Sequence, residues 1–363
     1  MELKCKQDGS FKIIQVSDLH EIVVGSALTR DFLRGLAKTE RPDLFVLTGD
    51  NISERLPAFG RERLRRRLIK RSIDAVMRVF DEIYRDHGIP VTMVLGNHDT
   101  EHSRVTREES FWMYAAHESF IGVAMPEADE GAMGASSHHF GTHNLLVKDK
   151  TGARPIFNLW MFDSGDYSNE GAARSYDGVR PPQIEWFRAK NAALDALPSL
   201  AFQHIIVPEI LDFLTPEGME GLNEAPCPGS FNYGQYAAMS EAGGVRALFV
   251  GHDHENSFQL LRDDGPDLVN TPTAGFGAYG KLPLRGVRVI ELNEKDLSVY
   301  GTHVVTYQEY YAPGALRYAR LALFEAPLGR TKLAANIIDA IAFRPVLGMG
   351  KLFQNIISKC HSK

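Results

Sequence analysis

The chain contains 363 residues, of which 44% are hydrophobic and 24% are charged, and its formal net charge at pH 7 is −6. This composition indicates an ordinary soluble globular protein, and the length is sufficient for a large core in roughly two domains. Three widely separated cysteines argue against a disulfide framework or a cysteine metal site, which favours a reducing compartment and a cytoplasmic location. The amino terminus lacks a signal-peptide core and no run of about 18 apolar residues occurs, so we expect no spanning helix.

The charge is divided unevenly along the chain. Residues 314–363 contain eight Lys or Arg and two Asp or Glu, so they carry +6 and leave −12 for residues 1–313. We expect a main domain at 1–313 and a basic amphipathic helical extension at 314–363. The acidic main domain argues against nucleic acid as a general partner.

The first part of the chain alternates strands and helices. Buried strands are predicted at 11–16, 44–47 and 91–95, separated by helices at about 29–39 and 61–86. This β-α-β order indicates an α/β fold with parallel strands and right-handed crossovers. Seven Lys or Arg residues in the first half of the second helix could bind an acidic ligand, but such runs are more often a solvated face.

The second part of the chain contains further strands and several long connections. After a helix at about 101–120, two antiparallel strands are expected near 139–147 and 156–163, and a helix begins at the two prolines 181–182. Strands that include an antiparallel continuation of the sheet are predicted at 200–207, 245–250, 258–262, 285–292 and 297–304. Candidate connections around a substrate are 124–137, 164–180, 209–231 and 271–280.

Five of the predicted strands carry or end in side chains that can bind metal ions. These side chains are Asp18 and His20, then Asp50, then Asn97, His98 and Asp99, then His204, and finally His252 and His254. Side chains at i and i+2 share one face of extended chain, so each of the two pairs with this spacing can face one ion. A lone histidine in an apolar strand is usually a packing residue, but five such positions together predict a site at the sheet edge where ligands bind.

Other histidines do not share this context. We interpret His138, His139 and His143, on a hairpin without partner carboxylates, as surface or packing residues. The selected side chains offer oxygen and nitrogen ligands that suit Zn, Mn and Fe. Two such ions about 3.5–4 Å apart form a site for phosphate ester hydrolysis, and Asp50, alone on its strand end, is the natural bridging carboxylate.

The combined pattern resembles the signature of the calcineurin-like metallophosphoesterase family over residues 11–305. The motifs that carry the resemblance are Asp18-x-His20, Gly49-Asp50, Gly96-Asn97-His98-Asp99, His204 and Gly251-His252-x-His254. The resemblance implies a four-layer α/β/β/α sandwich with mixed sheets and a dinuclear metal centre. It implies one metal ion bound by Asp18, His20, Asp50 and His254, and a second bound by Asp50, Asn97, His204 and His252.

The implied activity is that of a hydrolase acting on phosphoric ester bonds. A hydroxide bridging two Mn, Fe or Zn ions would attack a phosphate mono- or diester in line with the leaving oxygen. His98 would face the substrate and stabilise the phosphoryl charge or protonate the leaving group, with Asp99 orienting it. A membrane-lipid pyrophosphohydrolase and a non-catalytic scaffold are the alternatives, although scaffolds usually lose ligands and every position here is filled.

Differences between this chain and two subfamily patterns narrow the set of branches that it resembles. Asp99 and Ser53-Glu54-Arg55 disfavour the Ser/Thr protein phosphatase branch, which carries Gly-Asn-His-Glu and Asp-Arg-Gly. The purple acid phosphatase branch has a tyrosine ligand where this chain has Ser53, so we expect no Fe(III)–tyrosinate centre. The segments that follow His204 and His252, and the glycine-rich loop at 275–281, look like small cytosolic relatives of that branch.

The basic extension permits two interpretations. Apolar residues at helical spacing are Leu333, Ile337, Ile338 and Ile341, and then Leu347, Leu352, Phe353, Ile356 and Ile357. A basic amphipathic helix of this kind can dock peripherally on an anionic membrane. The alternative, which we favour slightly, is a terminal helix that packs on the acidic main domain.

Overall fold

The computed structural model describes residues 2–53, 62–100, 105–122, 141–168, 175–214, 219–311, 314–325 and 332–345. His138, His139 and the apolar positions from Leu347 to Ile357 lie outside the described residues. In the part of the chain that is described, no helix is both long and apolar enough to cross a membrane.

A five-stranded sheet is built around the first three predicted strands. Its order is β14-β13-β2-β3-β4, with β2 at Ser10–Val16, β3 at Leu44–Thr48 and β4 at Val91–Val94. These three strands pair in parallel, because α1 (Ala27–Thr39) and α2 (Glu62–His87) form the crossovers between them. The long hairpin of β13 (Gly286–Asn293) and β14 (Asp296–Thr306) adds to β2 with antiparallel pairing.

A seven-stranded sheet of order β1-β5-β6-β9-β10-β12-β11 lies against the first. Its strands are β1 (Leu3–Lys4), β5 (His143–Lys148), β6 (Pro155–Met161), β9 (Ser199–Phe202), β10 (Val245–Val250), β11 (Gln259–Leu260) and β12 (Asp267–Asn270). Strands β6, β9, β10 and β12 are parallel, and β5 and β11 pair antiparallel with their neighbours. Shorter elements are α3 (Arg107–Ala115), β7 (Tyr167–Ser168), β8 (Ser175–Tyr176) and α6 (Ile210–Phe213).

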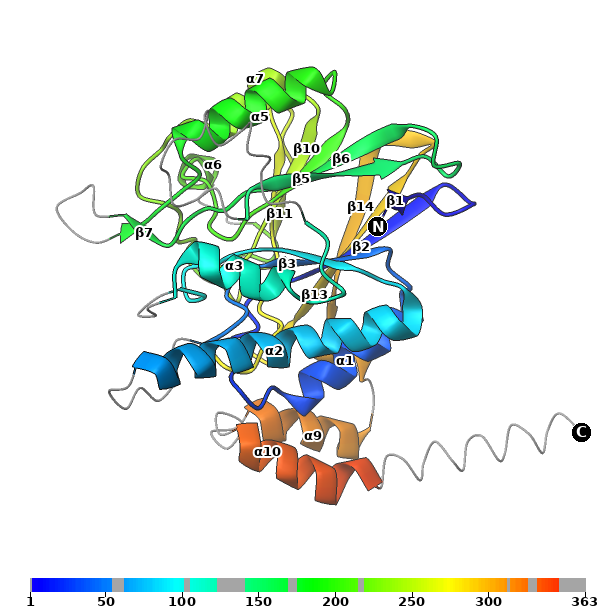
Figure 1. Ribbon diagram of the computed structural model, residues 1–363, viewed down its shortest axis with the longest axis vertical. Helices are drawn as coiled ribbons and strands as arrows, with labels where there is room; N and C mark the ends of the chain where they lie inside the picture. The colour runs from blue at the N-terminus through cyan, green and yellow to red at the C-terminus, as the bar shows by residue number, and fades with distance from the viewer. Residues whose placement is uncertain are drawn as a thin grey trace, which may run out of the picture.

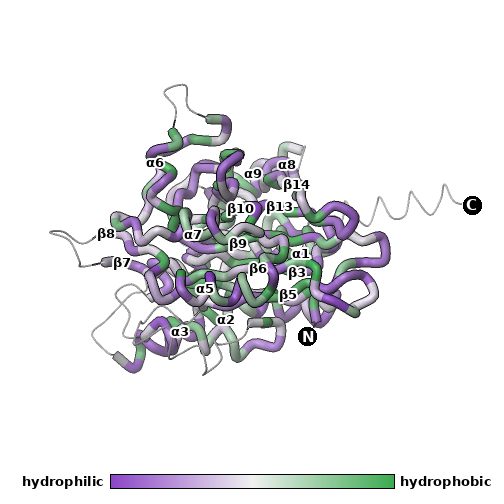
Figure 2. The backbone as a smooth tube through the Cα atoms, turned by 90° about the horizontal axis from the view of Figure 1, so that it is seen from above, coloured by the Kyte–Doolittle hydropathy of each residue, from purple (hydrophilic) through white to green (hydrophobic). Residues whose placement is uncertain are grey.

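Helices cover the outer face of each sheet, and the inner faces pack together (Figure 1). α5 (Pro181–Ala193) and α7 (Gln235–Ala242) cover the larger sheet, while α1 and α2 cover the smaller one. Between the sheets, Ile13, Val46 and Phe202 belong to one buried apolar cluster. Figure 2 shows the strands of this centre as largely hydrophobic. The predicted four-layer α/β/β/α sandwich is therefore confirmed.

The C-terminal extension packs on the α1 side of the sandwich (Figure 1). It follows the short helix α8 (Tyr307–Tyr310) and contains α9 (Ala315–Glu325), α10 (Lys332–Ile338) and a π-helical turn at Asp339–Phe343. Leu321, Phe324 and Ala335 join the apolar core formed with α1 and α2. This is the packing expected of a terminal helix on the main domain.

The sequence predictions were wrong in three details of the second half. The strand expected at 200–207 ends at Phe202, so His204 lies in the connection beyond it. β12 was missed because it has only four residues and a nearly continuous burial pattern, without alternation. The hairpin β13–β14 does not continue the sheet of β10–β12 but pairs with β2 in the other sheet.

Candidate metal centre

The five strand ends come together from both sheets. The ends of β2, β3 and β4 meet those of β9 and β10, and Gln15 Nε2 donates to Val250 O at 3.1 Å across the two sheets. All seven predicted metal-binding side chains are buried here: Asp18, His20, Asp50, Asn97, His204, His252 and His254. Because polar groups of this kind are rarely buried without partners, their convergence requires an explanation.

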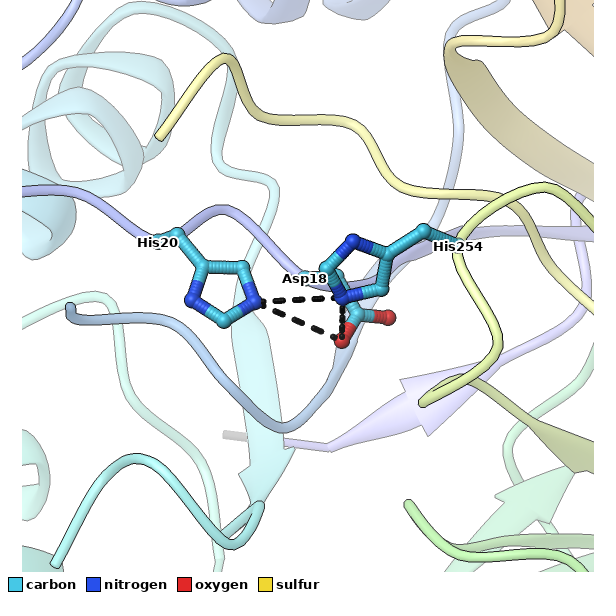
Figure 3. A group of neighbouring side chains, drawn as sticks. All are labelled: Asp18, His20 and His254. Carbon is cyan, nitrogen blue, oxygen red and sulfur yellow. Dashed lines mark hydrogen bonds and ion pairs between the residues drawn. The ribbon is translucent and has the colours of Figure 1, made fainter. Parts of the chain in front are cut away.

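The first group of side chains consists of Asp18, His20 and His254, whose ligand atoms lie within 4.8 Å of one another. Figure 3 shows the three side chains pointing toward one another. The two Nε2 atoms of His20 and His254 are 3.3 Å apart, and they lie 3.9 Å and 3.4 Å from Asp18 Oδ1. Three donor atoms thus surround one point.

The second group of side chains consists of Asp50, His204 and His252, again within 4.8 Å. His204 Nε2 lies 3.2 Å from Asp50 Oδ2 and 3.1 Å from Asn97 Oδ1, so Asn97 adjoins this group. Asp50 Oδ2 is also 3.8 Å from His20 Nε2. The Asp50 carboxylate therefore lies between the two groups, where a bridging ligand belongs.

Hydrogen bonds fix the tautomer of one histidine in each group. Nδ1 of His204 donates to Thr48 O at 2.7 Å, and Nδ1 of His254 donates to Tyr279 O at 2.9 Å. In a neutral ring, Nε2 is then left with a lone pair that faces the cluster, as in histidines that bind metals. Asp18 Oδ1 is buried and accepts no hydrogen bond from the described residues. The donor set fits two metal ions.

The electrostatics of the groups favour bound cations. Burial would raise the pKa of Asp18, but His254 and His204 outweigh burial and lower it to about 2. Burial would lower the pKa of His204, but Asp50 outweighs it and raises that pKa to about 9. For His20 burial dominates, and its pKa falls to about 3. The carboxylates thus remain charged and attract positive charge, which metal ions would supply while displacing protons.

Four of the metal-binding side chains sit on strained backbone. Asp18, His20, Asp50 and His252 have φ values of 55°, 44°, 51° and 71°, in the left-handed region that non-glycine residues rarely adopt. Hydrogen bonds between the loops hold this geometry. Asp18 N donates to Gly49 O at 3.1 Å, and His20 N donates to Asp50 O at 2.9 Å. Of the seven non-glycine residues with positive φ in the described part of the chain, four are thus metal-binding positions.

At three of these strand ends, a glycine stands directly before the metal-binding residue because a larger side chain would not fit there. A Cβ atom at Gly96 would collide with the Asp50 carboxylate, and one at Gly251 would collide with Ser17 Oγ. A Cβ atom at Gly49 would meet the backbone of Gly96. The glycines therefore allow the loops of neighbouring strands to approach one another.

His98 differs from the other histidines of the site in its exposure. Its side chain is 27% exposed, whereas those of His20 and His254 are each 5% exposed. Its Nε2 lies 4.0 Å from Asp50 Oδ2, and its ring centroid is 5.3 Å from that of His20. This is the position expected of a side chain that faces the substrate.

Asp99 does not make the contact that the sequence suggested. Its Oδ1 accepts hydrogen bonds from Asn51 N, Ile52 N and Tyr114 Oη at 3.1–3.2 Å, and its Oδ2 accepts one from Gly96 N at 2.8 Å. Within the described residues, none of its hydrogen bonds reaches His98. Asp99 instead joins the loop after β3 to the loop after β4, because its side chain turns toward the loop backbones.

The sequence alone did not single out two aromatic residues that lie beside the histidines. The Tyr279 ring stacks on His254 at 4.1 Å, and the Tyr176 ring meets His252 edge-on at 4.4 Å. Both lie in connections that the sequence singled out as approaching a substrate, at 271–280 and 164–180. His143 is buried and bonded to Thr92 Oγ1 at 2.9 Å, which confirms its interpretation as a packing residue.

The fold and the paired Asp/His groups define a metallophosphoesterase. Residues 11–256 match the calcineurin-like phosphoesterase family, to which the chain therefore belongs. The two groups contain six of the seven side chains that the resemblance assigned to metal ions, and they suggest the dimetal site typical of the family.

The relatives include a plant protein named as a purple acid phosphatase and a yeast protein named as a phosphatase. The chain is 30% identical over 336 residues to the "Probable inactive purple acid phosphatase 14" of Arabidopsis thaliana, covering 83% of this chain and 79% of the relative. It is 24% identical to "Phosphatase DCR2" of Saccharomyces cerevisiae, covering 81% of this chain and 53% of the relative. Among solved structures, a dimetal phosphatase from Danio rerio matches with a TM-score of 0.49 and 14% identity, covering 82% of this chain and 99% of that one.

Proposed function

We propose that the protein is a phosphoesterase that depends on two metal ions and hydrolyses a phosphate mono- or diester of a small molecule. The observation that carries this proposal is the position of Asp50, whose Oδ2 lies 3.2 Å from His204 Nε2 and 3.8 Å from His20 Nε2. One carboxylate thus serves both groups. Metal ions bound there would supply Lewis-acid activation of water and of the phosphoryl oxygens.

The side chains around the two metal groups have separate roles in the proposed reaction. His98, whose side chain is 27% exposed and whose Nε2 lies 4.0 Å from Asp50 Oδ2, is placed to donate a hydrogen bond to a phosphoryl oxygen or a proton to the leaving oxygen. The amide of Asn97 lies between His204 and the hydroxyl of Tyr167, to which Asn97 Nδ2 donates at 3.5 Å. Tyr176 and Tyr279 border the histidines and limit the approach of a substrate.

The names of the Arabidopsis relatives make loss of catalysis a real alternative. A scaffold that had lost activity would tolerate substitution at the ligand positions, and this chain retains all seven with the geometry of two metal groups. Mn, Fe and Zn are the metals that such a donor set favours. We therefore favour an enzyme over a non-catalytic scaffold.

The test is hydrolysis of p-nitrophenyl phosphate and bis-p-nitrophenyl phosphate by full-length protein loaded with Mn, Zn, Fe or Co. We expect turnover that a chelator abolishes and that Asp50→Asn reduces by at least about a hundredfold. The exposed His303→Ala on β14, remote from the centre, is the matched control and should keep full activity. Metal-loaded, folded protein without turnover on either ester would favour the scaffold.

We also propose a second role, which is peripheral contact with an anionic membrane. One exposed apolar surface favours this role. Leu333, Ile337, Ile338 and Ile341 on the outer face of the extension are 57%, 50%, 36% and 74% exposed. Such a face could bring a membrane-lipid pyrophosphate ester to the centre. Co-sedimentation of full-length protein and the Ile337→Glu/Ile341→Glu variant with phosphatidylserine vesicles tests this role, and equal sedimentation would remove it. A cytoplasmic location accords with the free thiols of Cys5 and Cys227.

A further inference from the structure

The C-terminal extension contacts the first metal group through a buried lysine. Lys332, the first residue of α10, is 2% exposed, and its Nζ donates to Glu21 Oε2 at 2.6 Å and to His20 O at 2.9 Å. A buried ion pair is stable only when both charges have partners, so the ammonium must stay in this position. It therefore fixes the backbone of His20 at its carbonyl oxygen.

The loop that Lys332 contacts is joined to the loop that carries Asp50. Glu21 N donates to Asn51 O at 2.9 Å, and Ser53 N donates to Glu21 O at 2.8 Å. His20, with φ of 44°, donates its own N–H to Asp50 O. The strained turn at His20 is thus held between the Asp50 loop on one side and Lys332 on the other.

A second route leads from the end of α9 to His254. Glu325 Oε2 accepts from Arg285 Nε at 2.8 Å, and the Arg285 guanidinium donates to the carbonyl oxygens of Gly275, Ala278 and Gly280. This loop contains Tyr279, whose carbonyl oxygen accepts from His254 Nδ1. The backbone of His20 and the imidazole of His254 therefore both have supports that extend to residues beyond 314.

The second group is held in a different way. His204 Nδ1 donates to Thr48 O, at the end of β3, which is an interior strand of the smaller sheet. Its neighbour Asn97 follows the adjacent strand β4. These contacts lie within residues 11–256, the segment that matches the family, whereas Lys332 and Glu325 lie outside it.

We propose that the C-terminal extension is part of the metal centre, with Lys332 and Glu325 as positioning residues for His20 and His254. Binding of the first metal ion then depends on the extension directly, whereas the second metal ion is linked to the extension only through the loop that carries Asp50. The inference rests on the proposed metal-dependent function. Changes to residues that orient metal-binding side chains typically weaken metal binding about 10–100-fold.

The experiment compares Lys332→Met with a matched variant, Arg320→Met, in the full-length protein. Arg320 is also buried and also anchors the extension, through Asp339 Oδ1 at 2.5 Å and Asp31 Oδ2 at 2.6 Å, but neither partner belongs to the metal centre. Mn²⁺ binding to the metal-free proteins is followed by calorimetry. Electron paramagnetic resonance distinguishes an isolated Mn²⁺ from a spin-coupled pair.

We expect Lys332→Met to raise one of the two dissociation constants about 10–100-fold and to show isolated Mn²⁺ where the wild type shows a coupled pair. Arg320→Met should retain the coupled pair even if its melting temperature falls. Wild-type affinities in Lys332→Met, or equal weakening of both sites in both variants, would overturn the inference. A wild type that bound no metal would instead overturn the proposed function, and this inference with it.

A double variant separates positioning from loss of stability. Lys332→Met alone leaves the buried carboxylate of Glu21 without its partner, which destabilises the fold. Lys332→Met/Glu21→Gln removes both charges and should recover much of the stability, but it still deprives His20 O of its donor. We expect first-site binding to stay weak in the double variant. Recovery of wild-type binding would show that the unpaired charge alone caused the defect and would refute positioning by Lys332.

Discussion

Asp99→Asn distinguishes a residue that supports the loops of the metal centre from one that serves His98. Asparagine keeps one oxygen, which can still accept from Asn51 N and Ile52 N. It places an amide NH₂ where Oδ2 now accepts from Gly96 N at 2.8 Å. Two donors then face each other in a buried site, and the hydrogen bond that closes the loop after β4 is lost.

The size of the effect follows from these hydrogen bonds. A hydrogen bond to a charged group contributes about 1.5–3 kcal/mol, and the bonds that remain lose their charge assistance. Burial, and after it the Asp50 carboxylate, raises the pKa of Asp99 to about 6, so a neutral side chain relieves some repulsion. We therefore expect the metal-free protein to lose about 2–3 kcal/mol of unfolding free energy. This value is near the lower end of the sum of the lost hydrogen bond and the weakened ones.

Thermal and denaturant unfolding of metal-free wild type and Asp99→Asn measure this difference, and calorimetry with Mn²⁺ measures the consequence for the centre. We expect a melting temperature lower by roughly 5 °C and weaker binding of metal, because the loop after β4, which carries Asn97, loses this hydrogen bond and its bonds to the Asp50 loop weaken. Unchanged stability and metal affinity with a large loss of kcat would refute the reasoning. That result would restore the interpretation that Asp99 orients His98.

The remaining predictions concern the centre and its supports. His98→Ala should lower kcat about 10²–10⁴-fold while elemental analysis still finds two metal ions, and full activity would contradict its role. Asn97→Ala should weaken the second metal about tenfold or more in calorimetric titrations, with the first unchanged. Gly251→Ala should cost about 1–3 kcal/mol in denaturant unfolding, because its Cβ would meet Ser17 Oγ; a neutral effect would show that the loops can separate. Burial would raise the pKa of Asp339, but Arg320 and Arg344 outweigh it and lower that pKa. Its contribution to stability is therefore full above the unfolded-state pKa of about 3.9 and is lost as pH falls through the lower folded-state value, so Asp339→Asn should flatten the acid limb of stability measured below about pH 4.

The positions of the metal-binding residues could be predicted because each lies next to an apolar strand in the sequence. Asp18, Asp50 and Asn97 follow strands whose α/β order already requires their carboxyl ends to meet. Local pattern and topology were therefore sufficient. The pairing of β13 with β2 was not predictable in this way, because it joins Arg288 to Gln15 across most of the chain.

The direction of the Asp99 side chain shows a different limit. Adjacency to His98 suggested a partnership, but a side chain at a strand end turns toward whichever donors the neighbouring loop presents. Here those donors are the N–H groups of Asn51 and Ile52, which only the packed structure brings close. Sequence proximity identified the residue without giving its role.

The sequence left two interpretations of the C-terminal extension open because several of its charges have partners far away in the chain. Lys332 pairs with Glu21, and Arg320 and Arg344 share Asp31 and Asp339. In the sequence, Arg320, Lys332 and Arg344 form part of a basic stretch that suits a membrane surface. In the structure they are used to dock the extension, so its apolar outer face, and not its charge, carries the membrane proposal.

The strained backbone at the metal centre explains why so many separate supports converge there. Left-handed conformations at Asp18, His20, Asp50 and His252 cost about 1–3 kcal/mol each, and their sum is comparable to the stability of a whole domain. They persist only where surrounding contacts leave no alternative. The close approach of the loops at the glycines, the hydrogen bonds that Asp99 accepts and the buried ammonium of Lys332 each remove one way for these loops to relax. Because the extension supplies one of these constraints, the contacts that hold the metal centre of this chain include a residue outside 11–256, the segment that matches the family.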